Sequence, residues 1–105
     1  MAYQQQGDVL IKRIDKIPAG ATSVERDKRG RVVLAEGEVT GHTHAIADAG
    51  CCLWEDGEKK YLGVDKPVTV VHEEHGPQVI EPGQYEIDIV KEYDHFAEEA
   101  RSVRD

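Results

Sequence analysis

The sequence predicts a mostly β fold, namely a small single-domain β-barrel or sandwich of short antiparallel strands with a C-terminal helix. Turn-forming residues recur at short intervals along the chain, which is typical of sandwiches and barrels. The segments between them are short and rich in β-branched and aliphatic residues. A length of 105 residues fits one domain. We therefore expect a single domain over residues 1–105, with a core at about 7–91 and a helix or tail at about 94–105.

Eight or so short strands are expected, as apolar or alternating runs bounded by turn signals, at residues 7–14, 22–25, 31–38, 42–47, 51–54, 59–64, 68–72 and 85–90. Residues 78–80 lead into a turn at residues 81–83. Alternation is clearest at Tyr85, Ile87 and Ile89, which indicates a half-buried strand. Residues 27–30 and 55–58 read as hairpin turns, the second with Asp-Gly at its centre.

The helix expected near the C-terminus begins at Asp94, a residue type that caps helices. Acidic residues lie early in this segment and arginines late, which suits the helix dipole.

The acidic balance of the chain argues against nucleic acid as a partner. The chain holds 21 acidic and 13 basic residues, for a net charge of -8. Such a surface repels phosphate backbones, and no basic run with interleaved aromatic residues offsets it. No apolar stretch approaches the about 20 residues that a membrane span needs. We expect neither a nucleic-acid nor a membrane partner.

The N-terminus and the cysteines favour a cytoplasmic location. The first residues lack the charged start and apolar run of a signal peptide. The only two cysteines, Cys51 and Cys52, are adjacent, and neighbours on a strand point to opposite faces, so they are poor disulfide partners for one another. A buried cysteine beside an exposed one is the expected arrangement, because the nearest charges are acidic and do not activate a thiol.

Four of the five histidines fall in two tight pairs, and they are the candidate metal ligands: His42, His44, His72 and His75. Residues two apart on a strand share a face, about 6.6 Å apart, so the first pair can lean onto one ion. The second pair, in a His-Glu-Glu-His run, lies where a strand ends and the chain turns. The fifth histidine, His95, lies outside both pairs and is expected at the surface.

The chemistry of this histidine set points to a transition metal. Glu38, Glu73 and Glu74 add carboxylates that serve as ligands or orient an imidazole. Imidazole with carboxylate suits zinc, iron, nickel or copper better than calcium or magnesium, and the sequence does not select among the four. Two other readings stay open: histidines that only hydrogen-bond to loop carbonyls at strand ends, and a metal-free catalytic role.

The stretch from Gly37 to His44, a Gly-led segment ending in His-x-His, resembles the opening half of the first cupin motif. Pro82-Gly83, followed by Tyr85, resembles the Pro-Gly turn of the second motif. The resemblance implies a small β-barrel with a central metal. The sequence departs from it in two places, because no glutamate follows His-x-His at the cupin spacing and the later histidines precede the Pro-Gly turn.

The segments GEVTGHTHAI and HEEHGP also resemble those of a group of short uncharacterised bacterial proteins. That similarity covers most of the chain and implies no particular activity.

Two functions follow as hypotheses. The first is a small metal-binding β domain of unknown substrate, in which three protein ligands would leave a position open for Lewis-acid chemistry or a small oxyanion, and four would make the ion structural. The second is a non-enzymatic assembly or accessory subunit whose histidines are structural or at an interface. Its partner would be a second copy of the chain, giving a homo-oligomer, or a larger protein. The sequence assigns no catalytic residue and leaves enzymatic activity open.

Overall fold

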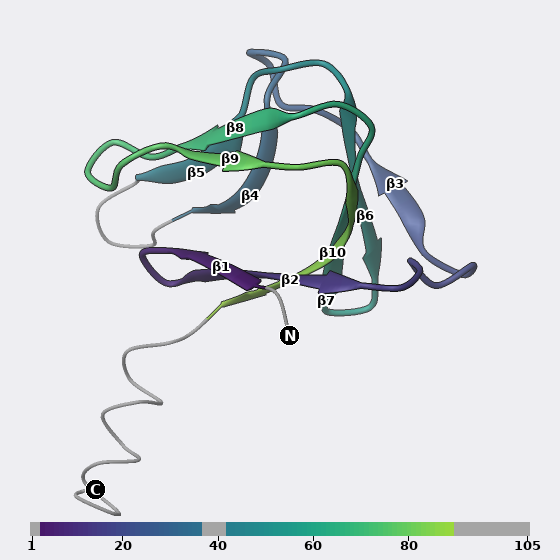
Figure 1. Cartoon of the computed structure of the whole chain (residues 1–105). Coiled ribbons are helices and arrows are strands. Elements are labelled where there is room, and N and C mark those ends of the chain that lie inside the picture. Colours follow the sequence, from purple (N-terminus) through teal and green to yellow (C-terminus); the bar gives the residue numbers. More distant parts are fainter. Residues whose placement is uncertain (1–2, 37–41, 90–105) are drawn as a thin grey trace, which may run out of the picture.

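The computed structural model of the protein describes residues 3–36 and 42–89, which form ten strands (Figure 1). In chain order these are β1 (Tyr3–Gln6), β2 (Val9–Ile14), β3 (Thr22–Val24), β4 (Val32–Glu36), β5 (Thr43–Ile46), β6 (Cys51–Asp56), β7 (Lys59–Val64), β8 (Val68–Val71), β9 (Gln78–Ile80) and β10 (Gly83–Ile89). The mostly β prediction is confirmed.

The strands form two antiparallel sheets. The larger has the order β1-β2-β10-β7-β6-β3, and the smaller has the order β4-β5-β8-β9. In Figure 1 the smaller sheet lies above β1 and β2, while β6 and β7 rise beside it, so the larger sheet curves around the core. The two sheets are not closed into a barrel, so the barrel form of the prediction is wrong. The arrangement of the two sheets around one core is called here the sandwich.

No helix is present in residues 3–36 and 42–89, and therefore none that could cross a membrane. The helix predicted at residues 94–105, together with His95, lies outside the described residues.

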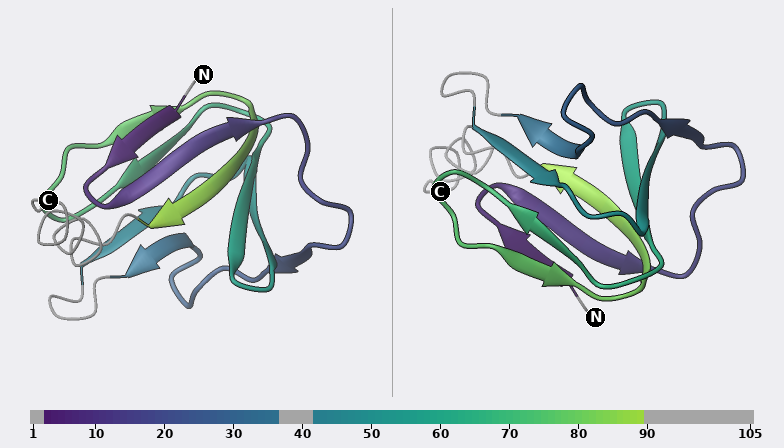
Figure 2. Two further views of the ribbon diagram at one scale, coloured as in Figure 1. Left: turned by 90° about the horizontal axis from the view of Figure 1, so that it is seen from below. Right: turned by 90° about the horizontal axis from the view of Figure 1, so that it is seen from above.

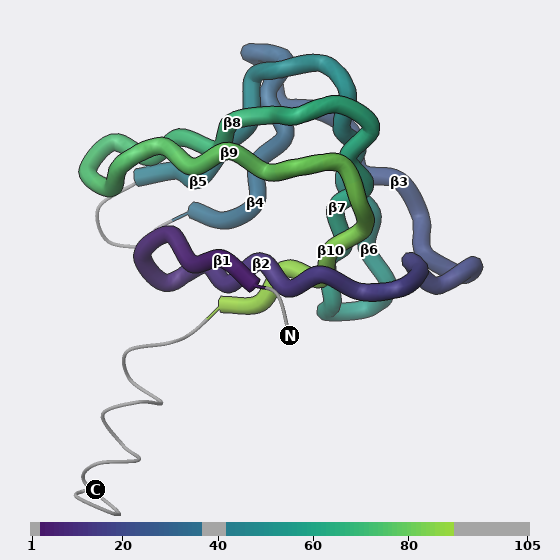
Figure 3. The backbone as a smooth tube through the Cα atoms, in the orientation of Figure 1, coloured from purple at the N-terminus to yellow at the C-terminus, as the bar shows by residue number. Residues whose placement is uncertain are grey.

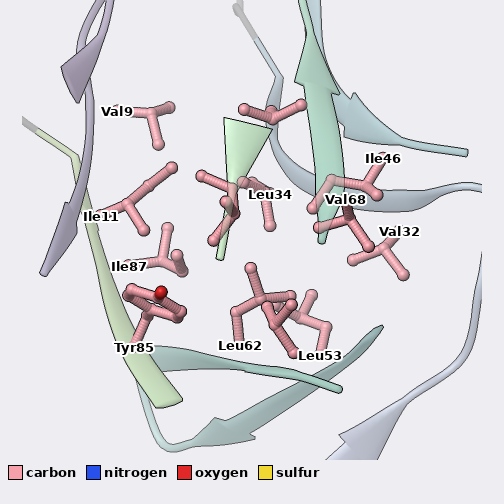
Figure 4. Packing of buried hydrophobic residues seen from close by; sticks show 13 residues of the cluster. Val9, Ile11, Val32, Leu34, Ile46, Leu53, Leu62, Val68, Tyr85 and Ile87 are labelled. Carbon is pink, nitrogen blue, oxygen red and sulfur yellow. The ribbon is translucent and has the colours of Figure 1, made fainter. Parts of the chain in front are cut away.

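The core lies between the sheets and consists almost entirely of aliphatic side chains from both (Figure 4). Its buried members are Val9, Ile11, Val32, Leu34, Ile46, Leu53, Leu62, Val64, Val68, Val70, Ile80, Tyr85 and Ile87. They occupy alternate positions on most strands, as a half-buried strand requires. Burying one such aliphatic side chain contributes roughly 1.5–3 kcal/mol.

Two strands, β1 and β9, were not predicted, and one predicted turn has a different role. Strand β1 has the sequence Tyr-Gln-Gln-Gln, which carries no β-branched residue, and it pairs only with β2. The turn at residues 27–30 forms, with Gly30 N donating to Asp27 O, but it does not close a hairpin. Strand β3 pairs with β6 and β4 pairs with β5, so this turn carries the chain from one sheet to the other. The hairpin predicted at 55–58 is confirmed.

Glutamine side chains bridge the two sheets along one side. Strands β1 and β9 are edge strands of different sheets. Gln4 Nε2 donates to Gln78 Oε1 at 3.3 Å and to Val79 O at 3.1 Å, and Gln78 Nε2 donates to Gln5 O. Side chains therefore supply the link between these edges that a backbone ladder would supply in a closed barrel.

Two connections lie at one end of the sandwich, the β1–β2 turn and the β8–β9 loop. Figures 2 and 3 show both beside the start of β5. This end carries the candidate site.

Candidate metal centre

The two histidine pairs, separated by about thirty residues in the chain, come together at this end of the sandwich. The ring centroids of His44 and His72 are 4.2 Å apart, and those of His42 and His72 are 5.4 Å apart. His75 lies 4.7 Å from His72 and 6.2 Å from His44 by the same measure. The structure thus gathers all four histidines singled out in the sequence into one cluster, called here the histidine cluster.

Strand register explains why the central two rings meet. Strands β5 and β8 are antiparallel, with Ile46 opposite Val70 and Ala45 opposite Val71. Extending this register by one step places His44 opposite His72, the residue directly after β8. Residues two apart share a face of a strand, so these two histidines continue the inward-facing rows of the core side chains. The cluster therefore caps the core at its open end.

Gln6, the last residue of β1, holds His44 in a defined orientation. Gln6 is 1% exposed and His44 is 3% exposed. Gln6 Nε2 donates to Val70 O at 3.1 Å and to Gly76 O at 2.8 Å, so its Oε1 is the acceptor that faces His44 Nδ1 at 2.8 Å. His44 Nδ1 therefore carries a proton, and in the neutral ring Nε2 keeps its lone pair. Metal-ligating histidines commonly have this arrangement, with the second nitrogen donating to an oxygen.

Asp8 and Gly7, which form the β1–β2 turn, complete this side of the cluster. Asp8 Oδ1 lies 3.2 Å from His44 Nε2. Gln6 pairs with Val9, leaving a two-residue turn in which Gly7 has a φ of 60°. A Cβ on Gly7 would lie 2.5 Å from His75 Nε2. Glycine is therefore needed here both for the turn and for the close approach of an imidazole.

His72 has the opposite hydrogen-bond pattern to His44. Its Nδ1 accepts from the backbone N–H groups of Glu74 at 3.0 Å and of His75 at 3.2 Å. In the neutral ring the proton is therefore on Nε2, and His72 presents a donor rather than a lone pair to its surroundings. These two bonds shape the start of the β8–β9 loop.

The two glutamates of the loop contact the segment that carries the first histidine pair, Glu73 at Thr43 and Glu74 at His42. Glu73 Oε1 accepts from the backbone N–H of Thr43 at 2.9 Å, and this bond, the largest of several causes, lowers the pKa of the Glu73 carboxyl. Glu74 Oε1 lies 3.6 Å from His42 Nδ1. The third glutamate predicted near the site, Glu38, lies outside the described residues.

Burial has the largest effect on the pKa of His44. It lowers the pKa of the imidazole, and the neighbouring His72 lowers it further, while Asp8 acts in the opposite direction. The buried ring is therefore more easily kept neutral, which is the form that binds metals.

As they stand, the side chains in residues 3–36 and 42–89 include no group of three or more histidine, cysteine, aspartate or glutamate residues arranged to hold a metal ion. The hydrogen bonds above give the physical reason. The backbone N–H groups of Glu74 and His75 donate to His72 Nδ1, so this nitrogen is not available to a metal ion. Ligation by all four histidines requires the β8–β9 loop to release His72.

Both cysteines are on β6, and their thiols are free in the structure. Cys51 packs against the core and Cys52 is exposed. Burial raises the pKa of the Cys51 thiol, despite the nearby Arg26, so this thiol is not an activated nucleophile.

Sequence reasoning missed three residues of this end, Gln6, Gly7 and Asp8. A Gly-Asp dipeptide after a polar strand is a turn signal, but only the pairing of β1 with β2 brings that turn to the histidines. No sequence signal marks Gln6, because glutamines are mostly exposed.

Comparison with curated proteins and with solved structures gives no match. A family model does match, over residues 5–89, and this span covers every described strand except part of β1. The matched span includes both histidine pairs and the β1–β2 turn. The chain therefore belongs to the family described as a domain of unknown function (DUF8820).

Proposed function

We propose that this protein is a metal-binding β domain that holds one transition-metal ion at the histidine cluster. The observation that carries the proposal is the convergence of His42, His44, His72 and His75 at one end of the sandwich. Four of the five histidines of the chain meet there, drawn from two distant segments.

The spacing of the rings supports a shared ion. Imidazoles bound to one tetrahedral ion through nitrogens at about 2.1 Å have ring centroids roughly 5 Å apart. The four measured separations run from 4.2 to 6.2 Å and bracket that value. For a nitrogen of each ring to reach one ion, the rings must rotate and His72 must leave its hydrogen bonds to the loop.

The ligand types indicate the class of ion. Imidazole with nearby carboxylate suits zinc, iron, nickel or copper rather than calcium or magnesium. With three ligands the ion keeps an open position for a small oxyanion or for Lewis-acid chemistry, and with four it is structural. The cupin likeness of the first histidine pair favours the same ion class, and the free cysteines favour a reducing, cytoplasmic location.

The experiment is metal analysis of protein purified without a histidine tag, stripped with chelator and reloaded separately with Zn²⁺, Fe²⁺ and Ni²⁺. The parent is expected to retain about one ion per chain after desalting. A His42→Ala/His44→Ala double variant should retain little. His95→Ala is the matched control, because it removes the one histidine outside both pairs. Metal far below one equivalent in the parent with all three ions would refute the proposal.

An assembly role is the second candidate, and surface residues favour it. Tyr3 on edge strand β1 is 58% exposed, and Val79 on edge strand β9 is 52% exposed. Glutamine side chains bridge the edges of these two strands, so the surface offered to another chain is the exposed apolar side chains themselves. If assembly is the function, the melting temperature will rise with protein concentration and will not respond to chelator.

A further inference from the structure

Asp8, which belongs to neither histidine pair, is placed to contact a cation at the histidine cluster. It follows Gly7 in the two-residue turn between β1 and β2, so its backbone position is fixed by the hairpin. Its side chain is 57% exposed, whereas that of His44 is 4% exposed. The pair therefore joins a buried imidazole to a carboxylate that reaches the surface.

The atoms that meet in this pair are two acceptors. Gln6 accepts from His44 Nδ1, which leaves the Nε2 lone pair of the neutral ring facing Asp8 Oδ1. Two acceptors at 3.2 Å repel unless a proton or a metal cation lies between or beside them. Gln6 Nε2 donates to both Val70 O and Gly76 O. A flip of the amide, which would turn its N–H groups toward His44, would break both hydrogen bonds.

The distance within the pair matches two ligands of one ion. A nitrogen and an oxygen each about 2.1 Å from a metal, at angles of about 90–110°, are roughly 3.0–3.4 Å apart. His44 Nε2 and Asp8 Oδ1 are 3.2 Å apart. His75 borders the same space, since its Nε2 and His44 Cε1 both approach the position that a Cβ on Gly7 would take.

We propose that Asp8 is a metal ligand, bound together with His44 Nε2 in a mixed nitrogen and oxygen set, and that Gln6 is the positioning residue that fixes which nitrogen of His44 binds. This inference rests on the proposed function of the cluster. A set of imidazole and carboxylate selects borderline divalent ions such as Zn²⁺ and Co²⁺ over soft Cu⁺. The exposed carboxylate also places one side of the ion next to solvent, where an added ligand can reach it.

The test compares Zn²⁺ and Co²⁺ binding by the parent with that by Asp8→Asn, which keeps a turn-compatible residue and removes the carboxylate. Asp15→Asn is the matched control, because Asp15 follows the other end of β2 and undergoes the same loss of charge. Affinity is measured by calorimetry, and the ligand set by the visible spectrum of bound Co²⁺. Asp8→Asn is expected to bind at least about 10-fold more weakly with an altered Co²⁺ spectrum, and Asp15→Asn to bind as the parent does.

Each outcome separates the two proposals. If Asp8→Asn binds as tightly as the parent with the same spectrum, while His44→Ala does not bind, Asp8 is only a hydrogen-bond partner and the inference fails although the cluster binds metal. If the parent binds neither ion, both proposals fail. Melting curves in chelator establish that each variant is folded, and Asp8→Ser provides a second carboxylate-free variant suited to the turn.

Discussion

Replacing Gln6 by leucine should destabilise the metal-free protein more than any comparable change on β1. The amide makes three hydrogen bonds, to His44 Nδ1, Val70 O and Gly76 O, from a side chain that is 1% exposed. Leucine has a similar size but makes none of them. The change leaves a buried N–H and two carbonyl oxygens without these partners.

The magnitude follows from the number of groups left unsatisfied. Each buried polar group without a partner costs about 1–3 kcal/mol, and the added apolar burial of leucine returns roughly 1 kcal/mol. Because water reaches part of this end, we expect a net loss of about 2–4 kcal/mol in the free energy of unfolding. In a domain of this size a loss of 1 kcal/mol lowers the melting temperature by about 4–8 °C.

The assay is urea unfolding in the presence of chelator, with Gln5→Leu as the control. Gln5 is the neighbouring residue, is exposed and donates to Gly7 O within its own turn, so its replacement should change stability by no more than about 0.5 kcal/mol. A loss below about 1 kcal/mol for Gln6→Leu would show that the three bonds do not hold this end together, and the assignment of the His44 tautomer would fall with them.

Three further predictions concern the cluster and the core. Because burial lowers the pKa of His44, the unfolded chain binds a proton that the folded chain resists, so stability in urea should fall as pH drops below about 6.5 and fall less in His44→Gln. Gly7→Ala should cost more than about 1 kcal/mol, because φ is 60° and the new Cβ meets His75, whereas Gly20→Ala, with no atom within 4 Å, should be near neutral in the same assay. Leu62→Ala should cost about 2–5 kcal/mol by thermal unfolding, since this core side chain is fully buried.

The β class and most strand positions could be predicted because they depend on local patterns. Tyr85, Ile87 and Ile89 alternate with polar residues, and β10 spans them. The distribution of strands between sheets could not be predicted in the same way. The turn at Asp27 looks like a hairpin in sequence, yet β3 and β4 find different partners, because pairing depends on distant strands and on the shape of the core.

The candidate site likewise holds residues that could be predicted from the sequence and residues that could not. The histidines were found because two pairs are conspicuous in a chain with only five. Asp8 and Gln6 were missed because their relation to His44 spans 36 and 38 residues and arises only when β1 folds onto β2 beneath β5 and β8. Glu73 was expected near the metal as a carboxylate, and the structure adds its bond to the backbone of Thr43, through which it orients the strand that carries the first pair.

The buried polar pair of Gln6 and His44 affects the free energy of unfolding in a way that can be tested. Aliphatic side chains at the positions of Gln6 and His44 would need no hydrogen-bond partners. The two polar side chains are tolerated in the interior because they hydrogen-bond to one another. Replacing both members of a buried hydrogen-bonded pair by apolar residues is often nearly neutral, while replacing one is not. The double variant Gln6→Leu/His44→Leu should therefore regain at least about 1 kcal/mol relative to the sum of the single variants, and should still fail to bind Zn²⁺.

Recovery of stability without recovery of binding would separate what this end contributes to folding from what it contributes to function. A double variant that is as unstable as the sum of the singles would mean that the two side chains act independently, contrary to the hydrogen bond between them.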